Sequence, residues 1–244
     1  MDSKSYRPTP EGPVEAIACF DCLARLSNLC VGLSDNNLPV LFHASSLVKL
    51  KRGQTLFLDD QFATHIYNIK RGTITVYRMG PAGQRQILGF PLTGDLIGLT
   101  PGETYGVSAE ACSDVQLCRW ERKKFEDFLL LFPALDRQFH LISSKVLASS
   151  IDLVYALGQL TAEQRVAGFL LRLGQRQEQA GGKSGMVHLP MSRNDIADYL
   201  GLTIETVSRA ITKLKNKRAL NLVAADQVRL RDLKALQSLG AGEE

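Results

Sequence analysis

The stretch from Ala134 to Leu157 contains neither glycine nor proline, the two residues that most often interrupt a helix. Within it, positions spaced alternately by four and three residues are mostly apolar. They are Leu135, Phe139, Ile142, Val146, Ser149, Leu153 and Ala156. This repeat is typical of an amphipathic helix that packs along its whole length. The sequence therefore predicts one long helix over 133–159, with a different pattern on either side of it.

The part before the long helix, residues 34–132, carries short runs of β-forming residues between turn signals such as the one at 80–83. The runs cover 47–50, 55–58, 65–69, 73–77, 86–90, 105–109 and 115–119. Many short strands at regular spacing are typical of an antiparallel β-barrel or a jelly roll. We expect that class of fold for this part of the chain.

The part after the long helix, residues 160–244, contains the signals of two consecutive short helices. Ser192 and Asp195 have the spacing of a capping box, and Gly201 would end the helix that they open. Thr203 would cap a second helix directly afterwards. Two helices joined by so tight a turn predict a helix-turn-helix, whose second helix enters the major groove of DNA.

Two short β-like runs, at 220–223 and 228–230, follow the predicted helix-turn-helix and would form its wing. A closing helix is expected over 232–239. The whole chain is therefore expected to be α+β: an N-terminal antiparallel β-barrel or jelly roll, a long dimerisation helix and a C-terminal winged helix-turn-helix.

Positive charge concentrates in the predicted DNA-binding part. The formal net charge of the chain is only +4, but residues 161–220 carry ten Lys and Arg against five Asp and Glu, a net +5. Outward Arg and Glu side chains can bond guanine and cytosine, and lysines farther along the helix suit phosphates. We expect DNA contacts from Thr203, Glu205, Ser208, Arg209, Thr212, Lys213 and Lys215.

A palindromic DNA site requires a twofold-symmetric reader, and this requirement bears on the long helix. Its apolar seam is either the contact between two copies in a parallel homodimer or the face that covers the β-rich part of its own chain. We favour the homodimer. Ser149, which lies in the seam beside Ser150, would weaken the contact, as suits a dimer close to its dissociation threshold.

Three of the five cysteines lie together near the N-terminus, in the expected sensor segment 1–33. The first eighteen residues lack the apolar stretch of a signal peptide, and no apolar run approaches the ~18 residues of a membrane helix. We therefore expect a cytoplasmic protein with no membrane partner. In a reducing compartment, the pattern Cys19-x-x-Cys22 suggests metal binding or redox exchange more than a disulfide.

An enzymatic function is not expected. None of the four histidines lies within metal-ligand spacing of another, and the sequence contains neither a nucleophile motif nor a phosphate-binding loop. The histidines are His43, His65, His140 and His188.

The predicted helix-turn-helix resembles that of the Crp/Fnr family of transcription regulators. The resemblance rests on the run IADYLGLTIETVSR at 196–209 and extends through GDLIG at 94–98 and AEQR at 162–165. It covers nearly everything after Cys19. The resemblance implies a cyclic-nucleotide-binding-like β-domain, a long dimer helix and a DNA-binding domain, in the order expected above.

Within this family, the pattern Glu-x-x-Ser-Arg in the reading helix marks the oxygen-responsive FNR branch. By this resemblance Glu205, Ser208 and Arg209 would read a palindromic TTGAT-type site in double-stranded DNA. The protein would act as an activator of anaerobic or microaerobic genes. Family members also touch RNA polymerase, and the tip at 79–85 is one candidate surface for that contact.

The resemblance also assigns a cofactor. FNR-like proteins hold a 4Fe–4S cluster on three N-terminal cysteines and one cysteine from the barrel. Here these would be Cys19, Cys22, Cys30 and Cys118, with Cys112 as the alternative fourth ligand. Seven residues separate Cys22 from Cys30, where many members have five, so the loop around the cluster must differ. The cluster is expected to control dimerisation and DNA binding.

Other sensors remain open from the residues alone. Four cysteines can bind zinc, cysteines can act as thiol redox sensors without metal, and another small effector could replace both. A cyclic nucleotide is disfavoured, because no Lys or Arg lies between Asp95 and Cys118 to receive a phosphate.

Overall fold

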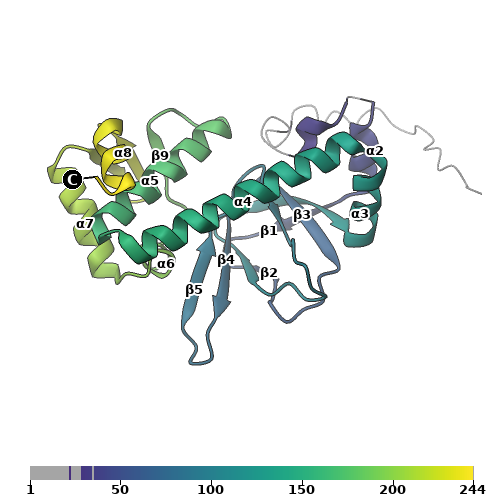
Figure 1. Ribbon diagram of the computed structural model, residues 1–244, viewed down its shortest axis with the longest axis horizontal. Helices are drawn as coiled ribbons and strands as arrows, with labels where there is room; N and C mark the ends of the chain where they lie inside the picture. The colour runs from purple at the N-terminus through teal and green to yellow at the C-terminus, as the bar shows by residue number, and fades with distance from the viewer. Residues whose placement is uncertain (1–21, 23–28, 35, 244) are drawn as a thin grey trace, which may run out of the picture.

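Figure 1 shows the computed structural model of the chain, which describes Cys22 and residues 29–34 and 36–243. A β-rich domain and a mainly helical domain lie at the two ends of the long helix α4 (Pro133–Gln159). The predicted α+β fold and its order are confirmed. Most of the predicted sensor segment 1–33, including Cys19, lies outside the described residues. Below, residues 46–121 are called the β-domain and residues 161–243 the reader domain.

Two four-stranded antiparallel sheets form the β-domain. The first has the order β1 (Ser46–Leu50), β8 (Val115–Glu121), β3 (His65–Arg71), β6 (Leu96–Ile97), and the second has the order β2 (Thr55–Phe57), β7 (Ser108–Ala111), β4 (Ile74–Met79), β5 (Arg85–Gly89). This alternation of early and late strands in both sheets is that of a jelly roll. The sheets stay open, so the jelly roll, and not a closed barrel, is the correct form of the prediction.

The space between the two sheets is a packed core. Phe57 stacks on Tyr105 with ring centroids 3.8 Å apart, and the ring of Tyr67 lies 5.8 Å from that of Phe57. All three rings are buried, and burial raises the pKa of the Tyr67 phenol well above its usual value. Because aromatic side chains fill this interior, it offers little room for a ligand.

The outer face of the first sheet is covered by helices. These are η2 (Leu29–Gly32), α2 (Leu38–His43), α3 (Arg122–Leu131) and the first half of α4. Trp120 of β8 is central to the contact: it is buried, its ring lies 5.9 Å from that of Phe125, and its Nε1 donates to the carbonyl of Leu41 at 2.8 Å. The outer face of β8 is therefore tied to the chain segment that follows the N-terminal cysteines.

The long helix is confirmed, and part of its predicted seam packs within the chain. Leu135, Ile142, Leu153 and Ala156 of that seam are buried within the chain itself. Leu135 and Ile142 belong to the same hydrophobic cluster as Trp120. The first half of the seam therefore covers the chain's own β-domain, which was the alternative left open, whereas Val146 and Ser149 of the seam are exposed, and a dimer contact there stays a prediction.

A second apolar face runs along the opposite side of α4. Since successive residues of an α-helix turn by about 100°, Leu147, Ile151 and Val154 lie roughly opposite the buried seam. These three side chains, which we call the outer stripe, are 63%, 60% and 70% exposed, and the exposed Leu141 and Tyr155 flank them. The helix is thus apolar on two faces, and only one of them packs within the chain.

By length and composition alone, α4 is the one helix among the described residues that could cross a membrane. Its most apolar window has a mean hydropathy of 1.3, and only 17% of that window is buried. This is weak evidence for a membrane span, because the charged Lys145 and Asp152 interrupt the apolar sequence of the helix. In addition, the face that contains Leu135 and Ile142 packs on the β-domain.

The reader domain contains four helices and one three-stranded sheet. They are α5 (Ala162–Gln179), β9 (Met186–His188), α6 (Arg193–Leu200), α7 (Ile204–Asn216), β10 (Leu220–Ala224), β11 (Gln227–Leu230) and α8 (Leu233–Ala241). The predicted winged helix-turn-helix is confirmed. Its wing is wider than expected, because β9 pairs with β11 and extends the predicted hairpin to the order β10-β11-β9.

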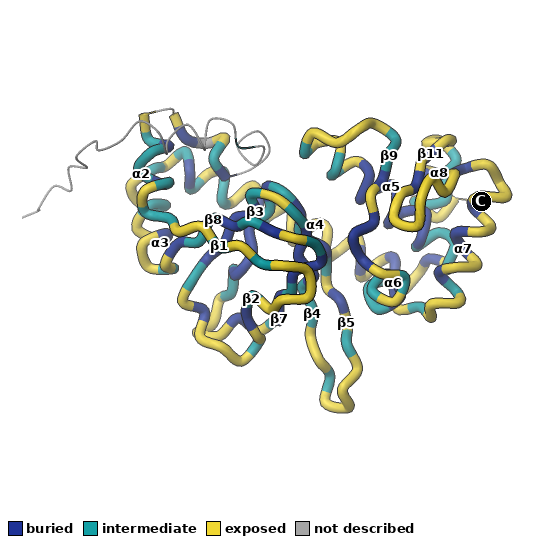
Figure 2. The backbone as a smooth tube through the Cα atoms, turned by 180° about the vertical axis from the view of Figure 1, so that it is seen from behind, coloured by how far each residue is buried: buried dark blue, intermediate teal, exposed yellow. Residues whose placement is uncertain are grey.

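One hydrophobic core joins the β-domain to the reader domain. Ile87, Phe90 and Leu92 of the β-domain belong to the same buried cluster as the core of the reader domain. The ring of Phe90 lies 6.0 Å from that of Phe169 and 5.4 Å from that of Tyr199. Figure 2 shows from behind how β5 lies beside α6. The two domains are thus packed together as well as joined by α4.

Candidate DNA-reading and sensor sites

The turn between α6 and α7 is built as the sequence predicts. Ser192 and Asp195 form a full capping box, with each side chain accepting from the other's backbone N–H. Gly201 ends α6 in the left-handed region at φ +61°, a conformation that favours glycine. The Thr203 hydroxyl then caps α7 by accepting from the Thr206 amide at 3.2 Å. Local signals therefore determine where the first helix begins and ends and where the second begins.

The two faces of the helix-turn-helix differ in burial. The inward positions are buried apart from Leu202, which is half-buried: Met191, Ile196, Ala197, Leu200, Val207, Ile211 and Leu214. The outward side chains at the start of α7 are exposed: Glu205, Ser208, Arg209 and Thr212. We call these four the reading face.

The charge state of the reading face suits base recognition. Hydrogen bonds from its own backbone amide and from the Thr203 side chain lower the pKa of Glu205 below its usual value. Glu205 therefore remains a carboxylate that can only accept hydrogen bonds, while Arg209 can only donate. Such a pair distinguishes bases that present donors from those that present acceptors in the major groove.

The predicted phosphate-binding lysines are not equivalent. Lys213 and Lys217 form ion pairs with Glu163 of α5, at 2.5 and 2.7 Å. The Glu163 side chain is mostly buried; this burial opposes its ionisation, but hydrogen bonds from the two lysines outweigh it and lower the pKa of Glu163. Lys215 is exposed and forms no ion pair within the part of the chain that the structure describes. Lys215 is thus more available to a phosphate than Lys213.

The role of Arg165 was not predicted from the sequence. The Arg165 guanidinium donates to three backbone carbonyls: Leu157 at 2.8 Å, Leu160 at 2.9 Å and Leu200 at 3.0 Å. These carbonyls lie near the end of α4, in the α4–α5 connection and at the end of α6. Arg165 therefore fixes the helix-turn-helix to the end of the long helix. The only sequence signal was its place in the AEQR run.

The two candidates for the fourth cysteine ligand lie in different environments. Cys118 of β8 is half-buried on the outer face of the first sheet, opposite Leu47 of β1 and Asn68 of β3. It packs against the same hydrophobic cluster as Cys30 of η2. Cys112 instead lies in the core shared with the reader domain, where burial raises the pKa of its thiol to about 11.

The predicted ligand set is only partly within the described residues. Cys22, Cys30 and Cys118 are described, whereas Cys19 is not. Among residues 22, 29–34 and 36–243, no three His, Cys, Asp or Glu side chains form a group that could hold a metal ion. Of the predicted ligands, Cys30 and Cys118 both pack against one hydrophobic cluster.

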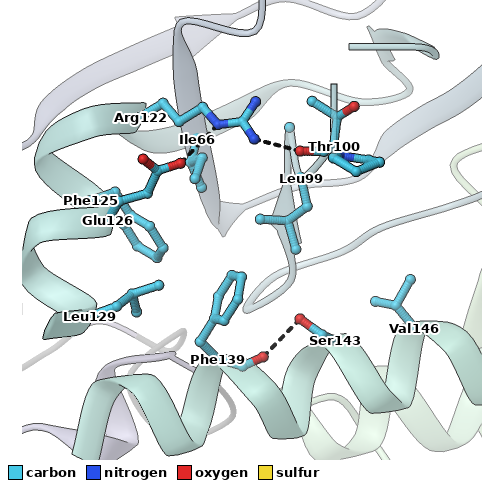
Figure 3. A pocket seen from close by; sticks show the side chains of 12 residues that line it. Ile66, Leu99, Thr100, Arg122, Phe125, Glu126, Leu129, Phe139, Ser143 and Val146 are labelled. Carbon is cyan, nitrogen blue, oxygen red and sulfur yellow. Dashed lines mark hydrogen bonds and ion pairs between the residues drawn. The ribbon is translucent and has the colours of Figure 1, made fainter. Parts of the chain in front are cut away.

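A cavity of about 350 Å³ lies between α3, α4 and the segment at 98–101 (Figure 3). Among the described residues that line it, the one cation is Arg122, which is already bonded: Nη1 donates to the Gly102 carbonyl at 2.9 Å, Nη2 to the Thr100 carbonyl at 2.6 Å, and Nε to Glu126 at 3.1 Å. The Ser143 hydroxyl donates to the Phe139 carbonyl at 3.0 Å. The remaining lining is mostly apolar, so the cavity is poorly suited to an anion such as a nucleotide.

Comparisons with known proteins match both domains. Residues 47–130 match the family model of the cyclic nucleotide-binding domain, and residues 164–239 match that of the Crp-like helix-turn-helix domain. The nitrogen fixation regulation protein FixK of Bradyrhizobium diazoefficiens is 38% identical over 84% of this chain and 86% of its own length. The transcriptional activatory protein AadR of Rhodopseudomonas palustris is 37% identical over 95% of this chain and 97% of its own length.

A solved structure supports the same conclusion. FixK2 from Bradyrhizobium japonicum superposes with a TM-score of 0.74 at 33% identity, covering 80% of this chain and 96% of that one. The jelly roll and the winged helix-turn-helix lie in the regions that the two family models match, with the long helix between them. The chain belongs to the Crp/Fnr family of DNA-binding transcription regulators.

Proposed function

We propose that this protein is a cytoplasmic, homodimeric transcription activator that responds to oxygen through a 4Fe–4S cluster. Cys19, Cys22, Cys30 and Cys118 would hold the cluster, and the dimer would bind a palindromic TTGAT-type site and contact RNA polymerase. The names of FixK and AadR, a nitrogen fixation regulator and a transcriptional activator, support a role in gene activation.

The observation that carries the proposal is the shared position of Cys30 and Cys118. They are far apart in the sequence, yet both pack against one apolar cluster on the outer face of the β-domain. Thiolates in a largely apolar setting fit iron–sulfur ligation. Cys112, which lies in another core, does not share this setting. When bound, the cluster would supply an oxygen-labile link between the N-terminal segment and β8.

The protein's own contacts offer a route from that site to the long helix. η2, which contains Cys30, lies against α4. Leu29 of η2 and Leu33, which directly follows η2, belong to the same cluster as Leu135 and Ile142 of α4. Holding Cys30 beside β8 therefore also holds η2 against the first half of α4. Release of Cys30 would loosen that contact and change the population of α4 conformations able to pair.

The dimer contact proposed is the outer stripe of α4. Leu147, Ile151 and Val154 repeat at steps of four and three, as in the seam of a two-helix coiled coil. Their exposure in a single copy is unusual for contiguous large apolar side chains and is typical of an interface. A twofold dimer would carry two reading faces, which must lie about 34 Å apart to reach successive major grooves.

The test of the cluster compares Cys118→Ser with Cys112→Ser, both purified without oxygen. The wild type and Cys112→Ser are expected to contain iron and sulfide, about four of each per chain, and to absorb visible light. Cys118→Ser should lose the iron and the colour. Iron and sulfide analysis with visible spectra makes the measurement, and circular dichroism checks that both variants fold.

Three results would contradict this assignment. Equal iron content in the two variants would exclude Cys118 as a ligand. Loss of iron only from Cys112→Ser would assign the fourth ligand to Cys112. Wild-type protein with zinc in place of iron would favour the zinc alternative, which uses the same thiolates.

Base reading is tested at Arg209. Arg209→Ala should weaken binding to the TTGAT-type site by about 1–3 kcal/mol, because an Arg that bonds a base in bidentate fashion contributes about this much to discrimination. The loss should be confined to one base pair of each half-site, where the variant tolerates substitutions that the wild type rejects. Lys215→Ala is the matched control, since a phosphate contact should affect all sequences equally. If Arg209→Ala instead weakened binding to all sequences equally, Arg209 would contact the DNA phosphate backbone and not a base.

A further inference from the structure

The β4–β5 hairpin of the β-domain is tied to the first helix of the helix-turn-helix by one arginine. The Arg85 Nε donates to Asp198 Oδ2 at 3.1 Å, and its Nη2 forms an ion pair with Asp195. All three side chains are largely covered, at 27% exposed for Arg85, 18% for Asp195 and 24% for Asp198. Ion pairs that are partly shielded from water are stronger than those on an open surface.

Three further contacts join the two domains. The Gln86 side-chain amide donates to the Asp198 carbonyl at 2.7 Å. The ring of Phe90 packs against that of Tyr199, and Arg176 of α5 forms an ion pair with Asp95 of the β-domain. Polar contacts therefore accompany the apolar contact between the two domains, and such contacts fix the orientation of two surfaces.

The hairpin contacts a face of the motif that is not used for reading. Arg85 and Gln86 bond to α6, whereas the reading face belongs to α7 and stays exposed while the hairpin is docked. Docking therefore leaves the reading face open to DNA. What docking restricts is the orientation of the reader domain relative to the β-domain and α4.

The chain connection alone gives little control of that orientation. Between the end of α4 and the start of α5 lie Leu160, in an extended conformation, and the N-cap Thr161. Rotation at so short a link would still turn the whole reader domain, and α7 with it, relative to α4. The hairpin supplies a second point of attachment, on α6.

We infer that Arg85 is a positioning residue for DNA binding: by docking the β4–β5 hairpin onto Asp195 and Asp198 of α6, it holds each reading face at the angle that a two-half-site DNA requires. This role rests on the proposed twofold mode of binding. A single half-site needs no fixed angle between two reader domains, so its affinity should not depend on Arg85. The side chain is also engaged within its own chain, which removes it from the 79–85 surface considered for RNA polymerase.

The experiment compares two duplexes, one with an inverted repeat of TTGAT half-sites one helical turn apart and one with a single half-site. Fluorescence anisotropy under anoxia gives the affinity of the wild type, Arg85→Ala and Arg78→Ala. Arg78 is an exposed residue of the same hairpin with no hydrogen bond or ion pair among the described residues, which makes it the matched control. For Arg85→Ala, affinity for the inverted repeat should fall about five- to thirtyfold, with the single half-site within about twofold and Arg78→Ala unchanged.

A charge exchange separates positioning from general damage. In Arg85→Glu alone, the new carboxylate would face Asp195 and Asp198, and binding to the inverted repeat should fall further than in Arg85→Ala. Combining Arg85→Glu with Asp198→Arg restores opposite charges, and should recover most of that loss. Thermal unfolding of each variant is measured alongside.

Each outcome has a defined meaning. Unchanged binding by Arg85→Ala, equal loss on both duplexes, or failure of the charge exchange to recover binding would overturn the role of Arg85. Tighter binding by Arg85→Ala would also overturn it, because docking would then be inhibitory. A wild type that binds one and two half-sites equally would overturn the proposed twofold mode itself, and the role of Arg85 with it.

Discussion

Replacing Ile151 by lysine is expected to leave the protein monomeric and to weaken its binding to an inverted-repeat site by about 10²–10⁴-fold. Ile151 is the middle residue of the outer stripe and is 60% exposed in a single copy. In a parallel twofold contact it would face its own counterpart, so the substitution would bring two ammonium groups together in an apolar interface. Without the dimer, the second half-site no longer adds to the affinity.

Ser149→Lys is the matched control for this variant. It adds the same charge to the same helix, but at a position on the side of the predicted seam. Ser149 is exposed, so the lysine can be accommodated without unfolding the chain. Sedimentation analysis of both variants decides between the two faces: a monomeric Ser149→Lys beside a dimeric Ile151→Lys would return the dimer contact to the original seam.

The second large effect is expected at Arg165. Arg165→Ala should lower the free energy of unfolding by about 3 kcal/mol, because three charge-assisted hydrogen bonds to carbonyls are lost together. The carbonyls of Leu157, Leu160 and Leu200 would also be left with weaker partners. Urea unfolding followed by circular dichroism measures the change, and the domain junction should become sensitive to protease.

Arg172→Ala in the same helix is the control for Arg165→Ala. Its guanidinium makes no hydrogen bond or ion pair among the described residues, so its removal tests only the loss of a charged side chain from α5. We expect a change within about 0.5 kcal/mol. Equal effects of the two substitutions would mean that the three carbonyl contacts of Arg165 do not stabilise the junction.

The features that depend on neighbouring residues were predictable from the sequence. Ser192, Asp195, Gly201 and Thr203 act through hydrogen bonds and backbone conformations a few residues away, and the helices begin and end where they indicate. Most strands were predictable for the same reason, since alternation and turn residues are also local, but β7 begins three residues after the start of the run predicted at 105–109, and the two-residue strand β6 was not predicted. The inward and outward positions of α7 then follow from helical periodicity alone.

For the long helix, periodicity does not predict which face packs within the chain. A heptad pattern identifies the helix and its length. It does not distinguish Ile142 on one side from Ile151 on the other, because both residues are equally apolar. Nothing local determines which face meets the chain's own β-domain and which meets a partner. That choice depends on the position of the jelly roll, which brings Trp120 and Phe125 to the Ile142 side.

Contacts between distant segments could likewise not be predicted from the sequence. Arg85 and Asp195 are 110 residues apart, and neither is unusual in its own surroundings. Cys112 and Cys118 looked interchangeable because both lie in apolar runs near the end of the β-domain. Only the pairing of β8 between β1 and β3 turns Cys118 toward η2, while Cys112 enters another core. The resemblance to the FNR branch favoured Cys118 without giving this reason.

The common core of β5 and the reader domain has an evolutionary consequence. A new promoter specificity is often pictured as arising by exchange of one DNA-binding module for another. In this chain, a module cut at Thr161 would leave Ile87 and Phe90 behind and would uncover Phe169 and Tyr199. Recombinants therefore have to inherit a compatible hairpin with the module, so point changes on α7 are the easier path to new operators.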